Sequence, residues 1–300
     1  MFRVSQNTFK LVICLLLLYM SWGSSFLGNK FALESFPGFL LTGLRFSIAG
    51  FVLLLYTYLR GERTTISLND FKYQMLNGFF MVLIASGLIA KGQEFNVPSG
   101  MAAILYGASP IWLMLSEWWF WGGDKPSTKQ IFGLGLGFGV LVWLNIHQGT
   151  SSEASIVGLL LIMGSTFAWV YGSHFTQKHK CDSDLSVLKA TGLLLFFGGL
   201  QSLILSYILG ERVDFFNVPI SAYLALLHLI VFSSIIAYST YIWLLFNSRA
   251  IVAISYEYIV PVIALLLGAF FANEKIDSTT IIASALLILS VCLVIITRKR

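Results

Sequence analysis

The sequence predicts an all-α integral membrane protein in which ten transmembrane helices form two inverted five-helix repeats. Three observations support this fold class: a strongly apolar composition, ten apolar runs of spanning length, and a gapless internal match between the two halves. Of the 300 residues, 57% are hydrophobic and 11% are charged, and the mean hydropathy is +0.82. Soluble domains carry about 25% charged residues, so the composition excludes a single soluble core.

The ten expected helices follow from the length that a bilayer demands. About 20 mostly apolar residues cross the hydrocarbon core, and a helix satisfies its own backbone groups where lipid offers no partner. Short breaks with Gly, Pro, Asn or charge separate the runs, as at 59–63, 122–126 and 210–212. The first run is too long for a signal-peptide core, so we expect a retained helix. In chain order, the expected helices cover 10–31, 37–59, 72–91, 98–121, 128–147, 154–177, 185–209, 221–246, 250–272 and 278–297.

The basic residues predict the orientation of these helices. With the N-terminus inside, the inner segments hold fourteen of the 19 Lys and Arg residues and the outer segments hold four, which leaves Arg45 inside a helix. By the positive-inside rule, both termini are then cytoplasmic. The net charge of +5 and the pI near 9.1 are therefore interpreted as topology signals, and no nucleic-acid partner is expected.

An internal repeat divides the chain into halves at 1–150 and 151–300. Segment 42–63 aligns with 191–212 at an offset of 149, with nine identities in 22 positions, and Trp22, Asn96, Ala102 and Pro110 have matches at similar offsets. Because each half has five spans, an odd number, the second half enters the membrane from the opposite side. An inverted repeat of this kind is typical of secondary transporters, although an ancient duplication in a channel or scaffold would leave the same pattern.

Several motifs resemble those of the EamA family, within the drug/metabolite transporter superfamily. The resemblance covers the whole chain and implies ten spans, with one EamA repeat in each half. It further implies a bacterial inner-membrane carrier, usually an exporter of metabolites, amino acids or drug-like cations. In Gly122-Gly123-Asp124, Asp stands where the family more often has Glu. The resembling motifs are Trp22-Gly23-Ser24, Leu44-Arg45-Phe46, segment 96–103 leading to Pro110, Ala168-Trp169, and Ser255-Tyr256 through Pro261 to Glu274.

Ionisable residues inside the spans are the first functional candidates, because each costs about 2.5–3.5 kcal/mol on insertion scales. Arg45, Glu117, His228 and Glu257 are expected there. Our hypothesis is that Glu257 binds a cationic or amino group and alternates its protonation, which makes it the proton-coupling candidate. The alternative is a buried glutamate hydrogen-bonded to a tyrosine such as Tyr106, its repeat mate at an offset of 151.

The other ionisable residues favour structural interpretations. Glu117 lies next to Trp118-Trp119, so a carboxylate that reaches the cytoplasmic surface is expected. Arg45 matches an arginine that is common in the EamA family, and for it a pair with a carboxylate is favoured over contact with substrate. Both are candidates for structural ion pairs, and His228 is interpreted as a packed histidine. Because the remaining histidines and the three cysteines have no ligand spacing, no metal or cofactor is expected.

Prolines and aromatic residues complete the expected substrate-binding set. Pro110 and Pro261 each remove one backbone amide at equivalent depth, and carriers bind substrate and bend at such breaks. Trp22 and Trp169 are repeat mates that offer cation–π faces, with helix packing as the alternative role. Polar contacts beside them are expected from Ser24, Tyr106, Tyr171 and Tyr256.

These observations favour a secondary active transporter, namely a proton-coupled exporter of small amphipathic metabolites, amino-acid-like or cationic and drug-like, that works by alternating access. The alternatives are a uniporter or exchanger of neutral metabolites, and a passive channel or structural membrane protein. No enzyme is expected, because H-E-x-x-H and G-x-S-x-G motifs are absent. The expected partners are a small-molecule substrate, protons and the lipid bilayer. The glycine row at 133–139 predicts close helix packing, within the chain or in a homodimer.

Overall fold

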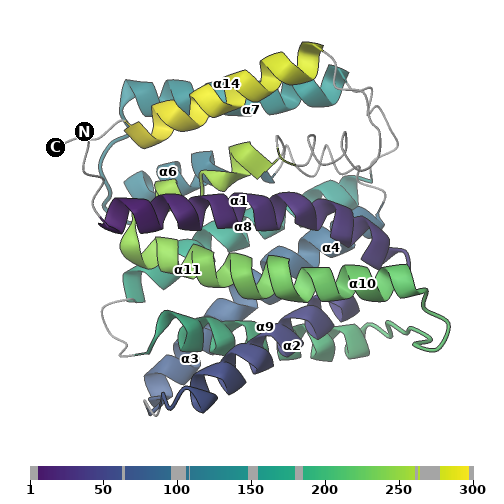
Figure 1. Cartoon of the computed structure of the whole chain (residues 1–300). Helices are drawn as coiled ribbons and strands as arrows, with labels where there is room; N and C mark the ends of the chain where they lie inside the picture. Colours follow the sequence, from purple (N-terminus) through teal and green to yellow (C-terminus); the bar gives the residue numbers. More distant parts are fainter. Residues whose placement is uncertain are drawn as a thin grey trace.

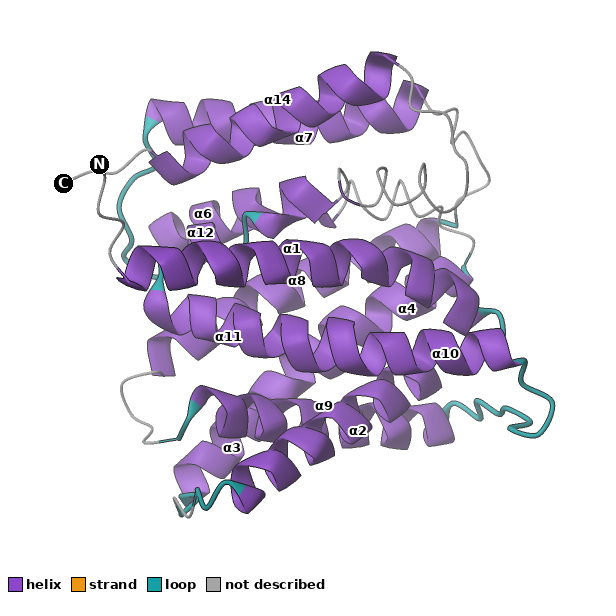
Figure 2. Cartoon of the chain, viewed as in Figure 1, coloured by secondary structure: helices purple, strands orange, loops and turns teal. Residues whose placement is uncertain are grey.

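Helices make up all the regular structure that the described residues contain (Figure 2). The structure is a computed structural model of the chain, and it describes residues 6–62, 65–95, 106–107, 109–147, 155–179, 185–260, 263 and 278–296. Within these residues the all-α prediction is confirmed. The elements are α1 (Gln6–Leu33), α2 (Gly38–Leu59), α3 (Leu68–Gly78), η1 (Phe79–Ser86), α4 (Gly87–Glu94), α6 (Ser109–Phe120), α7 (Thr128–His147), α8 (Ile156–Lys178), α9 (Val187–Ile208), α10 (Ile220–His228), η3 (Leu229–Ile236), α11 (Ala237–Asn247), α12 (Ala250–Ala253) and α14 (Ser278–Ile296).

Five helices are long and apolar enough to cross a membrane. Three shorter apolar helical stretches lie at Phe9–Ser25, Ala250–Val260 and Ile281–Ser290. The number of ten spans, their inverted arrangement and the cytoplasmic termini stay predictions. The five long helices are Gly38–Leu59, Leu68–Glu94, Ile156–Lys178, Val187–Ile208 and Ile220–Asn247.

The helices stack in layers in the view of Figure 1, with α14 and α7 in the outermost layer and α9, α2 and α3 in the opposite one. In the outer layer the glycine row packs inside the chain: Gly137 lies against Tyr258 and Ser290. The Ser290 hydroxyl also donates to the Gly133 carbonyl at 2.7 Å. A packing role within the chain therefore accounts for part of the row.

Two helices contain an unexpected π-helical segment. η1 interrupts the rod from Leu68 to Glu94, and η3 interrupts the rod from Ile220 to Asn247, at positions 150 apart. The π-helix is a rare, wide turn that often marks a functional site. The sequence predicted continuous α-helices here, because an apolar run is compatible with both an α-helix and a π-helix. Two carbonyl groups of these segments also accept hydrogen bonds from side chains far away in the sequence, which local patterns do not predict.

The helices α2 and α9 pack against each other as an antiparallel pair with repeated contacts (Figure 1). Gly50 lies against the backbone of Phe196, and Gly199 lies against the backbone of Ser47. These two contacts are equivalent, because Gly199 and Phe196 stand 149 positions after Gly50 and Ser47. A Cβ atom at either glycine would overlap backbone atoms of the facing helix. Both glycines lie in the segments that match in sequence, 42–63 and 191–212.

The repeated Gly-Glu-Arg sequence ends both helices with the same turn. Gly61 has φ +78° and Gly210 has φ +73°, a conformation that glycine adopts without strain. The Glu62 amide donates to the Thr57 carbonyl at 3.1 Å, and the Glu211 amide makes the matching bond to Ser206 at 3.0 Å. This is the Schellman pattern that satisfies the last carbonyls of a helix.

Each of these turns also caps the start of the other helix. The Glu62 carboxylate accepts from the amide and hydroxyl of Ser186 at 3.3 and 2.8 Å, just before α9. The Glu211 carboxylate accepts from the amide of Leu40 at 2.9 Å, in the first turn of α2. A carboxylate is favourable at a helix N-terminus, where the backbone N–H groups lack partners. The repeated residues therefore join the two expected halves.

Candidate functional site

A cavity of about 110 Å³ lies among α1, α2, α4, α8, α11 and the residues around 256–260. A cavity needs roughly 10–15 Å³ of this kind of volume to hold one water molecule, so the space suits several waters or a small solute. Its lining is mostly aromatic and polar, and it carries one residue of each charge. The lining residues are Trp22, Ser25, Asn29, Leu41, Thr42, Arg45, Ser86, Ile89, Ala90, Gln93, Tyr106, Trp169, Ser233, Tyr238, Tyr256, Glu257 and Val260.

Aromatic rings form a continuous wall of this cavity. Trp22 is 5.4 Å from Trp169 and 4.3 Å from Tyr256 between ring centroids. Tyr238 stands edge-on to both tryptophans at 5.7 Å. The two repeat mates Trp22 and Trp169, 147 positions apart, therefore meet at the cavity, as their predicted role requires. Whether they bind a substrate stays a prediction.

The two π-helical segments reach this cavity through one serine each. Ser86 of η1 and Ser233 of η3 both line it. The Met81 carbonyl accepts from the Ser86 hydroxyl at 3.2 Å and from the Tyr238 hydroxyl at 3.1 Å. The Ser233 carbonyl accepts from the Trp22 indole N–H at 3.1 Å. Side chains of other helices thus bond to carbonyl groups of the wide turns.

Glu257 follows a break in the helical backbone. α12 ends at Ala253, residues 254–255 form a turn, and helical structure resumes at 256–260. The Glu257 amide bonds back to the Ile254 carbonyl at 3.2 Å. The side chain is 6% exposed, and its Oε1 atom has no hydrogen-bond partner within the part of the chain that the structure describes. The carboxyl group hydrogen-bonds with the side chain of Tyr256, so only Oε1 lacks a partner. A buried carboxyl oxygen without a partner is costly, so this position suggests a ligand or a proton.

Arg45 reaches the same cavity from α2. Its Nη1 atom donates to Oδ1 of Asn29 at 3.2 Å, and its guanidinium carbon lies 4.2 Å from the centre of the Phe46 ring. The side chain is 8% exposed, and its Nε atom has no partner among the described residues. Across these residues, no carboxylate lies within 4.0 Å of the guanidinium. The expected structural ion pair of Arg45 therefore does not occur in the described part of the chain.

Glu117 lines a different cavity, of about 290 Å³, together with Asp124, Lys125 and Arg249. His174 lines it too and stacks on Trp121 at 3.6 Å between ring centroids. Arg45 and Glu117 are thus assigned to separate sites.

The other residues that were expected to bind substrate do not all line the first cavity. Tyr106 and Tyr256 line the first cavity, whereas Ser24 donates its hydroxyl to the Ser21 carbonyl at 3.1 Å. Tyr171 is exposed and packs on Phe80. Pro110 is buried in α6 away from the first cavity's lining, and Pro261 lies outside the described residues.

Sequence reasoning missed several residues of the lining, chiefly Asn29, Ser86, Gln93, Ser233 and Tyr238. Uncharged polar residues within or near apolar runs are common in membrane helices, where they bond to neighbouring backbone. The one usable signal was the row of hydroxyl side chains in the eighth run, at Ser233-Ser234 and 238–241, which overlaps and follows η3.

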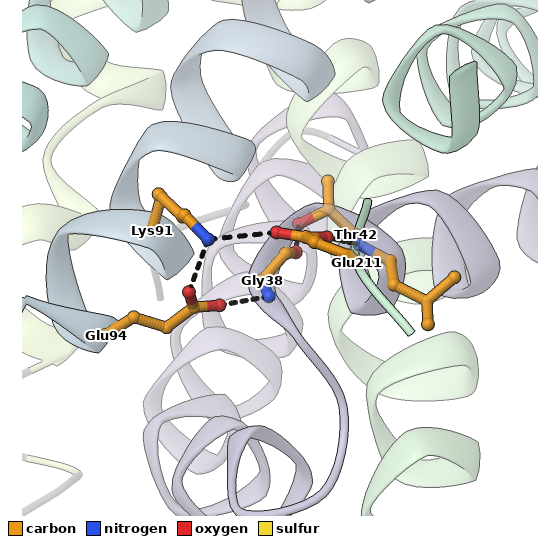
Figure 3. A network of polar contacts seen from close by, with 6 residues as sticks. Gly38, Thr42, Lys91, Glu94 and Glu211 are labelled. Atoms are coloured by element: carbon orange, nitrogen blue, oxygen red, sulfur yellow. Dashed lines mark hydrogen bonds and ion pairs between the residues drawn. The ribbon is translucent and has the colours of Figure 1, made fainter. Parts of the chain in front are cut away.

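A network of polar contacts surrounds Thr42, which lines the cavity (Figure 3). The Lys91 ammonium contacts Glu94 at 2.6 Å and Glu211 at 3.0 Å. The two carboxylates also accept from backbone amides at the start of α2, Glu94 from Gly38 and Glu211 from Leu40. Since Ala90 and Gln93 of α4 line the cavity, this network joins α4, the turn after α9 and α2 beside it.

The chain resembles known membrane transporters over most of its length. The profile of the EamA-like transporter family matches residues 9–146 and 156–296. "Uncharacterized inner membrane transporter YedA" of Escherichia coli (strain K12) is 28% identical over 277 residues, which cover 92% of this chain and 88% of that protein. "Probable amino-acid metabolite efflux pump" of the same strain is 22% identical, over 91% and 90% of the two chains. One crystal structure shares the fold with a TM-score of 0.76 and 18% identity, over 99% of both chains.

Proposed function

Because the chain belongs to the EamA-like transporter family and is embedded in a membrane, we propose that it is a proton-coupled exporter of the cell inner membrane. Its substrates are small amphipathic metabolites, amino-acid-like or cationic and drug-like, and it works by alternating access. The observation that carries this proposal is the buried Glu257 carboxyl, which faces the aromatic cavity with a free oxygen. The family and the relatives are transporters, so we propose no enzymatic activity.

Glu257 is the proposed coupling residue, because the free-energy cost of burying its charge must be offset by a partner or by a proton. An ionised carboxylate inside a membrane protein is stabilised only by a partner charge or by hydrogen bonds, and a proton removes the charge instead. When the cavity holds a substrate ammonium group, that group pairs with the ionised Glu257 carboxylate. When the cavity is empty, Glu257 carries a proton instead. Binding of one then excludes the other, and this competition is what proton-substrate exchange requires.

Alternating access is supported by the backbone breaks around the cavity. η1, η3 and the turn at 254–255 interrupt the regular α-helical hydrogen bonding of three rods that contact it. Helices bend at such interruptions, and carriers bind their substrate where broken helices meet. We propose that the network of Lys91, Glu94 and Glu211 closes the side of the cavity that Ala90 and Gln93 line. We propose that its opening exposes the cavity to the outside.

Purified protein in liposomes tests this function. A trapped pH dye reports proton movement while a panel of amino acids, polyamines and cationic drugs is offered across a proton gradient. We expect saturable, substrate-dependent proton movement, and at least about a 100-fold loss in Glu257→Gln, since one removable charge at such a site is worth about 3 kcal/mol or more. Glu34→Gln, at an exposed turn, is the matched control and stays active.

Two other outcomes would contradict the proposal. Substrate exchange without proton movement would make the protein a uniporter or exchanger, with a structural Glu257. Flux that rises without saturation would indicate a channel.

A further inference from the structure

The two largest features of the interior, the first cavity and the second cavity that Glu117 lines, lie one beyond the other along shared helical segments. Trp169 of α8 lines the first cavity, and His174 of the same helix lines the second. Five residues of an α-helix rise by about 7.5 Å, so a short distance separates the two spaces. Two further segments show the same order, with Tyr106 and Glu257 at the first cavity and Met114 and Ile251 at the second.

A layer of fully buried side chains separates the two cavities. It comes from four helical segments, and each of its members stands in the sequence between a residue that lines the first cavity and one that lines the second. All four side chains are 0% exposed, and none of them is charged at neutral pH. We call this layer the seal; it consists of Leu113, Ser173, Tyr241 and Ile254.

Tyr241 of α11 connects the seal to the aromatic wall of the first cavity. Its ring stacks on Trp169 at 5.0 Å and stands edge-on to Tyr256 at 5.8 Å between centroids. Its hydroxyl donates to the Ser173 oxygen at 2.7 Å, because the Ser173 hydroxyl itself donates to the Trp169 carbonyl at 2.7 Å. Tyr241 belongs to neither cavity lining. It therefore supports the wall from the side of the second cavity and fastens α11 to α8.

The two ends of the first cavity differ in their chemistry. Near Thr42 lies the ionic network, in which the Lys91 and Glu94 side chains are 25% and 27% exposed. Salt screens exposed charges of this kind. The seal at the other end contains buried apolar groups and a hydrogen bond between two hydroxyls, Tyr241 and Ser173. Its closure therefore depends on dry packing and on this bond.

The second cavity, beyond the seal, suits passage better than tight binding. Its volume is about 290 Å³, and charged side chains of both signs line it. Charged groups stay hydrated unless a partner replaces the water, and no ion pair within 4.0 Å joins these side chains in the described part of the chain. The charged residues are Glu117, Asp124, Lys125 and Arg249.

Resting on the proposed carrier function, we propose that the seal is the second gate of the carrier and that the hydrogen bond from Tyr241 to Ser173 is its latch. When this bond breaks and α11 separates from α8, the first cavity opens into the second. The second cavity is then the entrance for substrate on that side of the membrane.

Labelling of a cysteine in the first cavity tests the gate. In a variant without native cysteines, Val260→Cys places a thiol on the cavity wall. Lys125→Cys, exposed at the second cavity, identifies the side on which that cavity opens. An impermeant methanethiosulfonate is added to one side at a time. From the Lys125 side, we expect Val260→Cys to react much more slowly than Lys125→Cys, because the seal is closed.

Variants of the latch should open this gate. Tyr241→Phe keeps the ring and removes the hydroxyl, so labelling of Val260→Cys from the Lys125 side should speed about fivefold, the factor for one typical buried hydrogen bond. Ser173→Ala should give a similar gain, and the double variant no more than either one, because both changes remove the same bond. Tyr223→Phe is the matched control. It loses a hydroxyl bond to the Phe215 carbonyl at the other end of the same rod and leaves the rate unchanged.

The side of labelling distinguishes a gate from general loosening. An opened gate speeds labelling from the Lys125 side and not from the opposite side. Thermal unfolding verifies that the variants are folded, and either single variant is sufficient if the other fails to fold.

Three results would overturn the inference. Labelling that speeds equally from both sides, or in neither single variant, rejects the latch. Val260→Cys that reacts as fast as Lys125→Cys through the unaltered seal rejects the gate. In both cases, saturable transport by the unaltered protein leaves the carrier function standing. No saturable transport of any compound in the panel rejects the carrier function, and the gate with it, whatever the labelling shows.

Discussion

Trp22 links the cavity wall to a π-helical segment. Its ring packs on Trp169 and Tyr256, and its indole N–H donates to the Ser233 carbonyl of η3 at 3.1 Å. Its sequence position predicted an aromatic face toward the cavity. The hydrogen bond was not predictable, because it joins positions 211 apart. Trp22 therefore stabilises the wide turn as well as shaping the site.

Removal of this one hydrogen bond is the prediction at the residue scale. Trp22→Phe keeps an aromatic ring but leaves the Ser233 carbonyl without its donor. We expect the free energy of unfolding to fall by about 1–3 kcal/mol, the usual cost of an unsatisfied buried polar group. Titration with SDS, followed by circular dichroism, measures the loss. Trp119→Phe, on an exposed part of α6, is the control and changes little. Equal stability of the two variants would show that the bond is dispensable.

At the scale of elements, the α2–α9 pair is a contact between equivalent surfaces. Gly50 meets the backbone of Phe196, and Gly199 meets that of Ser47. Small residues permit this close approach, which is a main source of attraction between helices in lipid. The sequence match at 42–63 and 191–212 located both glycines without showing that they face each other's helix.

Valine at Gly50 is expected to separate these helices. Its Cβ atom overlaps backbone atoms of α9, which cannot rotate away. Gly50→Val should destabilise the protein by about 1–3 kcal/mol, the range for overpacked sites, as measured by unfolding in SDS. Gly199→Val should cost a similar amount, because its contact is equivalent. Gly135→Val in α7 has open space and controls for the lower helix propensity of valine. A Gly50 variant as stable as this control would contradict the close packing.

At the scale of the whole molecule, the network in Figure 3 connects elements from both expected halves. Lys91 and Glu94 belong to the first half, and Glu211 belongs to the second. The Glu211 side chain is 6% exposed and also caps α2 at Leu40. An ion pair that forms in one conformation and not in another stabilises the first. The equilibrium between the two conformations shifts by the free energy that the ion pair contributes.

Loss of Lys91 is expected to open this side of the cavity. In a variant without native cysteines, Thr42→Cys places a thiol on the cavity wall. Lys91→Met should speed its labelling by an impermeant external reagent about fivefold, since exposed to half-buried pairs contribute up to about 1 kcal/mol. Arg212→Met, beside Glu211, is the control. A rate that rises only when the reagent is added inside would reverse the predicted orientation, and an unchanged rate would exclude the network as a gate.

The sequence by itself determined the all-α class and the family. Composition and run length set the all-α class, because a backbone in lipid satisfies its hydrogen bonds within each helix. The matched Gly-Glu-Arg turns were visible, since a left-handed residue and a helix cap have local signatures. Glu257, Trp22 and Trp169 were predicted as substrate-binding residues from charge, ring type and the repeat. All three line the cavity, and their roles stay predictions.

Only the tertiary structure decided what those residues meet. Arg45 was expected to pair with a carboxylate, and it instead faces the cavity that Glu257 also lines. Glu117 belongs to another cavity, and two π-helical segments replaced regular helix. The physical reason is that the periodicity of apolar residues indicates only which face of a helix a residue occupies and which local backbone it adopts. The partner of a buried charge, or of a carbonyl in a wide turn, comes from a helix that lies far away in the sequence. Its position depends on how all the helices pack together.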